Sequence, residues 1–191
     1  LAIAIPLTTE MPTVLHLWLG EVSEQSILFS RLMIVYIILM AMNNPISIIM
    51  HASGKIKEYN LPVESITIMC VPVTWLLFKL GFPAYSVFFS IICLCLVAHV
   101  VRLLCLKRYY SSFHIRTYLT TIISPSLLVA VLTIAASYLL HSLIANTWLR
   151  LSAVSLLTPL LLSIIVYFYG ISAEEKQLIK TLVKTLRHRK K

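Results

Sequence analysis

Glu10 is the residue whose type and position most clearly indicate chemistry, because it is a carboxylate in the middle of an apolar stretch. A carboxylate at that depth in a bilayer is costly unless it is paired, hydrated or protonated, and it marks a transport pathway by default. Pro6 and Pro12 flank it, and each removes a backbone donor, so we expect a bent helix with carbonyls that need water or side chains. The segment is therefore predicted to line a cavity. The alternative is that Glu10 pairs with a cation elsewhere in the protein.

Asn43, Asn44 and Pro45 form a second polar interruption of an apolar run. Two amides beside a proline can hydrogen-bond freed carbonyls, or they can present donors and acceptors to a sugar or phosphate. Polar side chains also join membrane helices without touching a ligand, so both interpretations stay open. Lys55 follows this segment, and Arg102 precedes a basic loop, where it can either snorkel to an interface or meet an anionic headgroup.

The composition excludes several kinds of enzyme. All seven acidic residues are Glu, so catalytic sites that need an Asp, including Asp-centred triads and Asp-based metal–phosphate sites, are absent from this sequence. The four Cys lie in apolar runs, where a thiol behaves as a small hydrophobe. We expect no disulfide, no metal, no cofactor and no enzymatic activity.

The elements that must position these residues are membrane-spanning helices. Hydrophobic residues make up 59% of the chain and charged residues 12%, against roughly 25% charged in a soluble domain. Runs of about 20 apolar residues are long enough to cross a bilayer. We expect an all-α bundle with six such spans, at about 1–20, 27–52, 61–80, 84–106, 118–141 and 147–170.

Charge sets the expected orientation. Most of the sixteen Lys and Arg follow the second, fourth and sixth spans, so the positive-inside rule places these loops and the C-terminus in the cytoplasm. Residues 171–191 are predicted to form a basic amphipathic helix on the anionic inner leaflet, or else a solvated tail. The basic residues lack interleaved aromatic platforms, so no nucleic-acid partner is expected. The apolar run beginning at Leu1 suggests the C-terminal part of a longer chain.

Several segments resemble one family over about residues 1–108. They are IPLTTEMPTVLHLWLG at 5–20, FSRLMIV at 29–35, HASGKIKEY at 51–59, VPVTWLLFKLGFP at 71–83, and Arg102 ahead of its basic loop. Together they resemble the C-terminal half of bacterial O-antigen-type polysaccharide flippases of the multidrug/oligosaccharidyl-lipid/polysaccharide superfamily.

The resemblance implies a fold and a function. The fold would be two helical lobes around a central cavity. Residues 1–108 would be the last four helices of a MATE-like second lobe, 109–170 two additional spans, and 171–191 the tail. The implied function is flipping of undecaprenyl-pyrophosphate-linked oligosaccharide across the bacterial plasma membrane by alternating access. The partners would be the bilayer, that lipid-linked substrate and the N-terminal half of the protein. As a hypothesis, the substrate or ion pathway includes Glu10, Asn43, Asn44, Lys55 and Arg102, with Glu10 coupling transport to protons and Pro6, Pro12 and Pro45 bending the helices.

Three alternatives remain open at this point. A MATE-type drug or cation antiporter would want a more acidic cavity than one carboxylate among basic and amide groups provides. A membrane-embedded glycosyl or acyl transferase would need a catalytic base with supporting residues, and no His, Glu or Cys spacing here supplies one. A structural membrane subunit would leave Glu10 and the paired Asn residues without a function.

Overall fold

The computed structural model describes residues 1–110, 113–144 and 146–167, and within these ranges every regular element is helical. Five helical stretches are long and apolar enough to cross a membrane. They are Glu24–Ala52, Ile56–Lys79, Ser86–Tyr109, Ile115–Leu143 and Thr147–Ile165. The all-α fold predicted from the sequence is therefore confirmed, and five of the six predicted spans have a counterpart. The predicted tail at 171–191 lies outside the described residues.

The chain divides into two compact units. One comprises Glu10–Thr117, and the other joins Leu1–Thr9 to the segment that begins at Tyr118. These divisions differ from the boundary at 108 that the resemblance implies, and the lobe assignment of 1–108 and 109–170 stays a prediction. Each unit is described by itself below.

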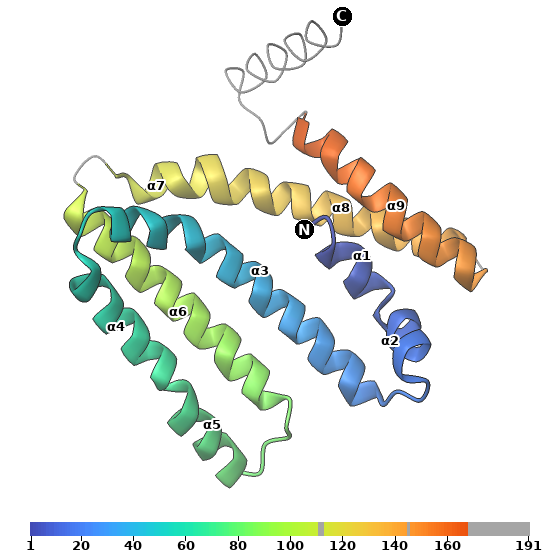
Figure 1. Cartoon of the computed structure of the whole chain (residues 1–191), viewed down its shortest axis with the longest axis horizontal. Coiled ribbons are helices and arrows are strands. Elements are labelled where there is room, and N and C mark those ends of the chain that lie inside the picture. Colours follow the sequence, from blue (N-terminus) through green and yellow to red (C-terminus); the bar gives the residue numbers. More distant parts are fainter. Residues whose placement is uncertain (111–112, 145, 168–191) are drawn as a thin grey trace, which may run out of the picture. The chain divides into compact units, whose positions relative to one another are not determined.

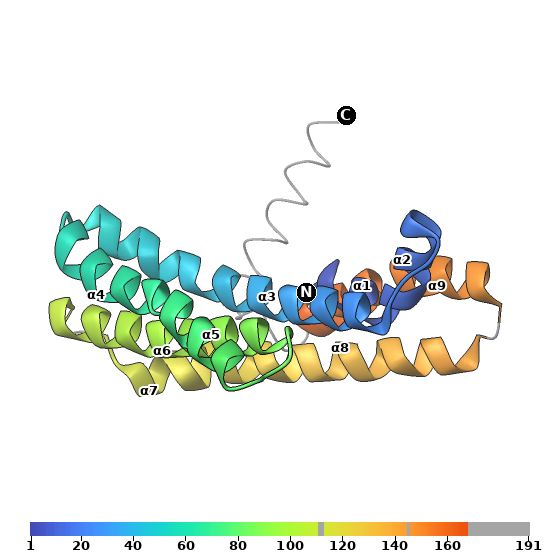
Figure 2. The same ribbon diagram turned by 90° about the horizontal axis from the view of Figure 1, so that it is seen from below.

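The unit Glu10–Thr117 is built around α6 (Ser86–Tyr109). It packs against α3 (Glu24–Ala52) and against α4 (Ile56–Ile68) and α5 (Cys70–Lys79), and these helices lie side by side in both ribbon views (Figures 1 and 2). The short helix α2 (Met11–Leu19) contacts α3. Ser23 begins α3 as its N-cap, because its hydroxyl accepts a hydrogen bond from the Ser26 amide at 3.2 Å.

Buried side chains of α3 and α6 follow helical spacing. Asn43, Ile46 and Met50 share one buried face of α3, and three of the buried residues of α6 are polar. From α4, Tyr59 and Val63 are 2% and 1% exposed and pack into the same core. The buried residues of α6 are Ser86, Ser90, Cys95, Ala98, Arg102, Leu103 and Leu106.

The second unit packs α1 (Ala4–Thr9) against α8 (Ser124–Leu143) and α9 (Thr147–Ile165). A short helix, α7 (Ile115–Tyr118), and one π-helical turn, Leu119–Ile123, lead into α8. Small hydroxyl residues lie between the helices of this second unit. The Ser137 hydroxyl lies 3.1 Å from that of Thr9 and accepts a hydrogen bond from Thr158 at 3.4 Å. Such bonds join apolar helices at modest gain each.

Prolines explain where the helices break. The predicted span 1–20 is divided at Glu10 into α1 and α2, because Pro12 lacks an N–H for the Thr8 carbonyl and its ring crowds that carbonyl. Pro72 stands in the same relation to Ile68, where α4 ends. Pro6 lies near the start of α1, while α3 continues through Pro45 and changes course towards its C-terminal end (Figure 1).

The outward faces of the long helices are apolar. In the most apolar window of each candidate span, between 6% and 28% of the residues are buried within the protein. Large apolar side chains such as Trp75, Phe89 and Leu127 are exposed on these faces. Contact with water would be unfavourable for them, whereas contact with the acyl chains of lipids is favourable. The helices are thus those of a membrane-embedded protein.

Candidate functional site: a cavity beside Arg102

The unit Glu10–Thr117 contains a cavity of about 340 Å³ between α3, α4 and α6. Volumes of this order are typical of small-molecule sites. Its wall is mostly apolar, with one guanidinium and one carboxylate. The lining residues are Met33, Tyr36, Met40, Glu64, Thr67, Cys70, Phe88, Ile91, Leu94, Cys95, Ala98 and Arg102.

Arg102 is the cation of this cavity. It is 8% exposed and lies seven residues before the end of α6, which places it about 10 Å along the helix from Tyr109. Its Nε donates a hydrogen bond to the Tyr59 hydroxyl at 3.1 Å. No other described residue accepts a hydrogen bond from the guanidinium or forms an ion pair with it. The remaining N–H donors are therefore available to a ligand on the cavity side.

Tyr59 connects Arg102 to a chain of hydrogen bonds on α3. The Ser47 hydroxyl donates to the Asn43 backbone carbonyl at 3.2 Å and lies 2.7 Å from the Tyr59 hydroxyl. Since the Ser47 proton is used on that carbonyl, Tyr59 must donate to Ser47 while it accepts from Arg102. The chain fixes the Tyr59 hydroxyl, and through it the position of the guanidinium.

Asn43 is 2% exposed and joins α3 to α6 through its side-chain amide. Its Nδ2 donates to the Cys95 Sγ at 3.6 Å, and its Oδ1 lies 2.6 Å from the His99 Nδ1. Because an amide oxygen only accepts, His99 must carry its proton on Nδ1 in this contact. Of the two interpretations of Asn43, helix joining is the one its contacts match.

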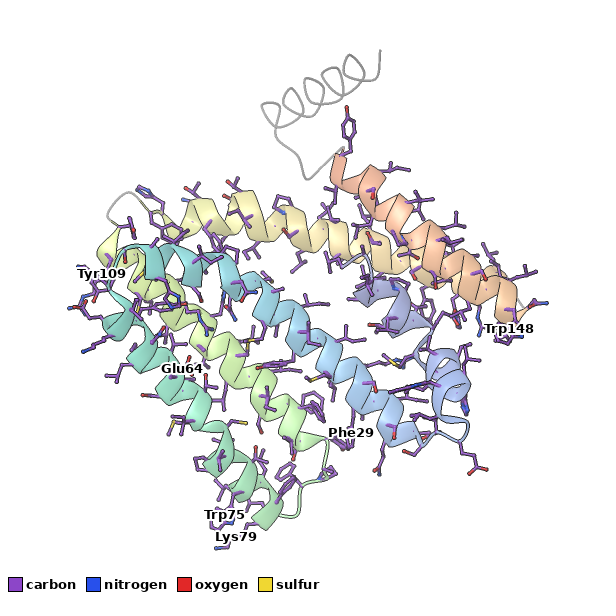
Figure 3. All side chains as sticks on the ribbon, viewed as in Figure 1. Phe29, Glu64, Trp75, Lys79, Tyr109 and Trp148 are labelled. Atoms are coloured by element: carbon purple, nitrogen blue, oxygen red, sulfur yellow. The ribbon has the colours of Figure 1, made fainter. Side chains whose placement is uncertain are left out.

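Asn44 and Lys55 lie away from the cavity. Asn44 is exposed, since neighbouring positions on a helix point about 100° apart and Asn43 takes the buried side. Lys55 is exposed at the start of α4, with its Nζ 4.2 Å from the centre of the Tyr109 ring. The Tyr109 hydroxyl in turn donates to Glu58. Figure 3 marks Tyr109 at this end of α6.

Glu10 is 1% exposed and lies at the break between α1 and α2, where it accepts a hydrogen bond from the Thr13 hydroxyl at 3.0 Å. It is not among the residues that line the cavity beside Arg102. Of the five predicted pathway residues, only Arg102 lines that cavity, so the described structure does not bring the five together.

Sequence reasoning missed four contributors to the site: Ser47, Tyr59, Glu64 and His99. Ser47 follows Asn43 by four residues, and His99 lies between Cys95 and Arg102 at spacings of four and three, so helical phase alone could have placed them on common faces. Glu64 lies early in the predicted span 61–80. Over the described ranges, no group of three or more His, Cys or Glu side chains is arranged for a metal ion.

Comparison with family models, with curated proteins and with solved structures finds no match to this chain.

Proposed function

We propose that the chain is part of a transporter that flips undecaprenyl-pyrophosphate-linked oligosaccharide across the bacterial plasma membrane for surface polysaccharide synthesis. The sequence segments that resemble polysaccharide flippases support this proposal, and so does the cationic cavity. In this proposal the chain works by alternating access with an N-terminal half, and its C-terminus is cytoplasmic.

Arg102 carries the proposal. A cation buried inside a candidate membrane helix is costly unless an anion or water compensates it. Tyr59 occupies Nε and leaves the outer nitrogens of the guanidinium, whose planar geometry suits two phosphate oxygens at once. Neither the pyrophosphate nor the oligosaccharide of the substrate can cross about 30 Å of hydrocarbon alone, and the pyrophosphate is the charged part. Arg102 would bind it, while the apolar side of the cavity accommodates the first prenyl groups.

Glu10 has a separate role in the proposal. Its carboxylate is buried at the helix break, two residues before Pro12. A carboxylate in such a place can exchange a proton as hydration changes during the transport cycle. We assign it to proton coupling, at a distance from the phosphate that we assign to Arg102.

The test measures surface polysaccharide in a bacterial strain whose export depends on the protein that contains this chain. Arg102→Gln should lower export about tenfold to a hundredfold, the equivalent of one lost charge-assisted hydrogen-bonding group. Arg102→Lys should give an intermediate level of export, because lysine keeps the positive charge but lacks the planar guanidinium that can bind two phosphate oxygens at once. Glu10→Gln should abolish the dependence of export on the proton gradient.

Arg108→Gln is the matched control, since Arg108 lies on the same helix and is exposed. Membrane levels of each variant are compared by immunoblot. Normal export by Arg102→Gln at a normal protein level would remove the phosphate role. Unchanged export and ion dependence in Glu10→Gln would remove the coupling role only.

A further inference from the structure

The cavity beside Arg102 has a polar end and an apolar end. On α6 its lining runs from Phe88 to Arg102, fourteen residues or about 21 Å along the helix axis. Arg102 lies at one end, and Met33 and Phe88 are the lining residues at the other. Such a polarity matches an amphiphile with a charged headgroup and a hydrocarbon chain.

The cavity carries charges of both signs. Glu64 lines the same cavity from α4, and Figure 3 marks it between the two ends of the α4–α5 stretch. Neither Glu64 nor the outer nitrogens of Arg102 have a hydrogen-bond or ion-pair partner among the described residues. A carboxylate in a candidate membrane helix needs a cation, a proton or water as much as a guanidinium needs an anion.

One ligand that brings a phosphate and an ammonium together would satisfy both groups. We propose that this cavity binds a single phospholipid with an ethanolamine headgroup, its phosphate on Arg102 and its ammonium on Glu64. One acyl chain lies along Met33, Met40, Ile91 and Leu94. The lipid site goes beyond the proposed transport function and stands without it, because it depends only on the cavity and its two charges. Arg102 would hold either this lipid or the pyrophosphate of the transport substrate, one at a time.

Charge complementarity selects this headgroup over its competitors. A glycerol headgroup offers the same phosphate to Arg102 but no cation to Glu64. A choline headgroup carries a cation without N–H donors, so it cannot hydrogen-bond the carboxylate. Ethanolamine alone among these supplies both a phosphate and an N–H cation.

The experiment measures lipid retention by the purified full chain. The protein is delipidated in detergent, incubated with equimolar dioleoyl-phosphatidylethanolamine and dioleoyl-phosphatidylglycerol, and washed, and bound lipid is quantified by mass spectrometry. We expect about one ethanolamine lipid per chain, at an excess of about tenfold over the glycerol lipid. Equal retention of the two lipids, or a preference for the glycerol lipid, would overturn the proposal.

Two variants make the result specific to the two charges. Glu64→Gln should remove the preference or reverse it, while Arg102→Gln should lower retention of both lipids. Glu21→Gln, at an exposed position outside the cavity, should behave as the wild type. A Glu64→Gln protein that keeps the tenfold preference contradicts the assignment, and far-ultraviolet circular dichroism confirms that each variant is helical. Because lipid retention is measured without transport, failure here leaves the flippase proposal to its own export assay.

Discussion

Single hydrogen-bonding groups decide whether a buried polar site in a membrane protein is a ligand site or a helix joint. Asn43 has both polar ends of its amide engaged, by Cys95 and by His99, so it joins helices. Arg102 has one donor engaged and the others available, so it can bind a ligand. From residue type alone, Asn43 and Arg102 were both predicted to line the pathway. Their hydrogen-bond partners in the structure distinguish the helix-joining residue from the one that can bind a ligand.

Tyr59 is the residue whose loss should reveal this arrangement. Tyr59→Phe removes the hydroxyl that accepts from Arg102 and donates to Ser47, and leaves the Nε of the buried Arg102 without its partner. We expect a destabilisation of about 1–3 kcal/mol, measured as a lower midpoint of thermal unfolding in detergent. Tyr36→Phe is the control, because the Tyr36 hydroxyl has no partner among the described residues, and its midpoint should stay close to the wild type. Equal midpoints for the two variants would contradict the hydrogen-bond chain.

At the scale of elements, the sequence predicted that helices exist and where prolines lie, but not what each proline does. Pro45 leaves α3 continuous, while Pro12 and Pro72 coincide with helix ends, and Pro125 follows a π-helical turn. A proline always removes one donor. Whether the helix bends, breaks or widens depends on which neighbours satisfy the freed carbonyl, and those neighbours come from other parts of the chain.

Pro72 offers a direct test of this account. In Pro72→Ala, the new amide can donate to the Ile68 carbonyl and remove the break at Met69. Hydrogen exchange of the amides around residues 69–73 should then slow, as expected for a continuous helix. Pro83→Ala, in the turn between α5 and α6, should leave that exchange unchanged. Equally fast exchange at 69–73 in Pro72→Ala would mean that tertiary packing causes the break.

At the scale of the whole molecule, composition predicted the class of protein but not the position of its cavity. The low charge content and the long apolar runs pointed to a membrane helix bundle, and the described residues include five helical stretches long and apolar enough to cross a membrane. The cavity was not predictable in the same way, because α3, α4 and α6 meet through contacts between residues far apart in the sequence. Asn43 and His99 are 56 positions apart, and Tyr59 and Arg102 are 43 apart. Hydropathy reads one segment at a time, whereas a cavity depends on which faces of separate segments meet.

The stretch Ile56–Lys79 makes the membrane assignment testable. Its 24 residues extend about 36 Å as a helix, enough to cross about 30 Å of hydrocarbon. A cation lies over an aromatic ring at each end, Lys55 over Tyr109 and Lys79 over Trp75 at 5.1 Å (Figure 3), as amphipathic rings at the two interfaces would allow. Residues just outside the two ends should therefore face opposite sides of the membrane.

Cysteine labelling checks this in cells. With the four native Cys replaced by Ala, Lys57→Cys and Phe82→Cys are introduced separately at exposed positions near the two ends of this stretch. A membrane-impermeant maleimide should label Phe82→Cys in intact spheroplasts and Lys57→Cys only after permeabilisation, because the basic end is expected in the cytoplasm. Labelling of both from the same side would contradict a single crossing by this helix pair. The reverse pattern would keep the crossing and overturn only the orientation that the positive charges predict.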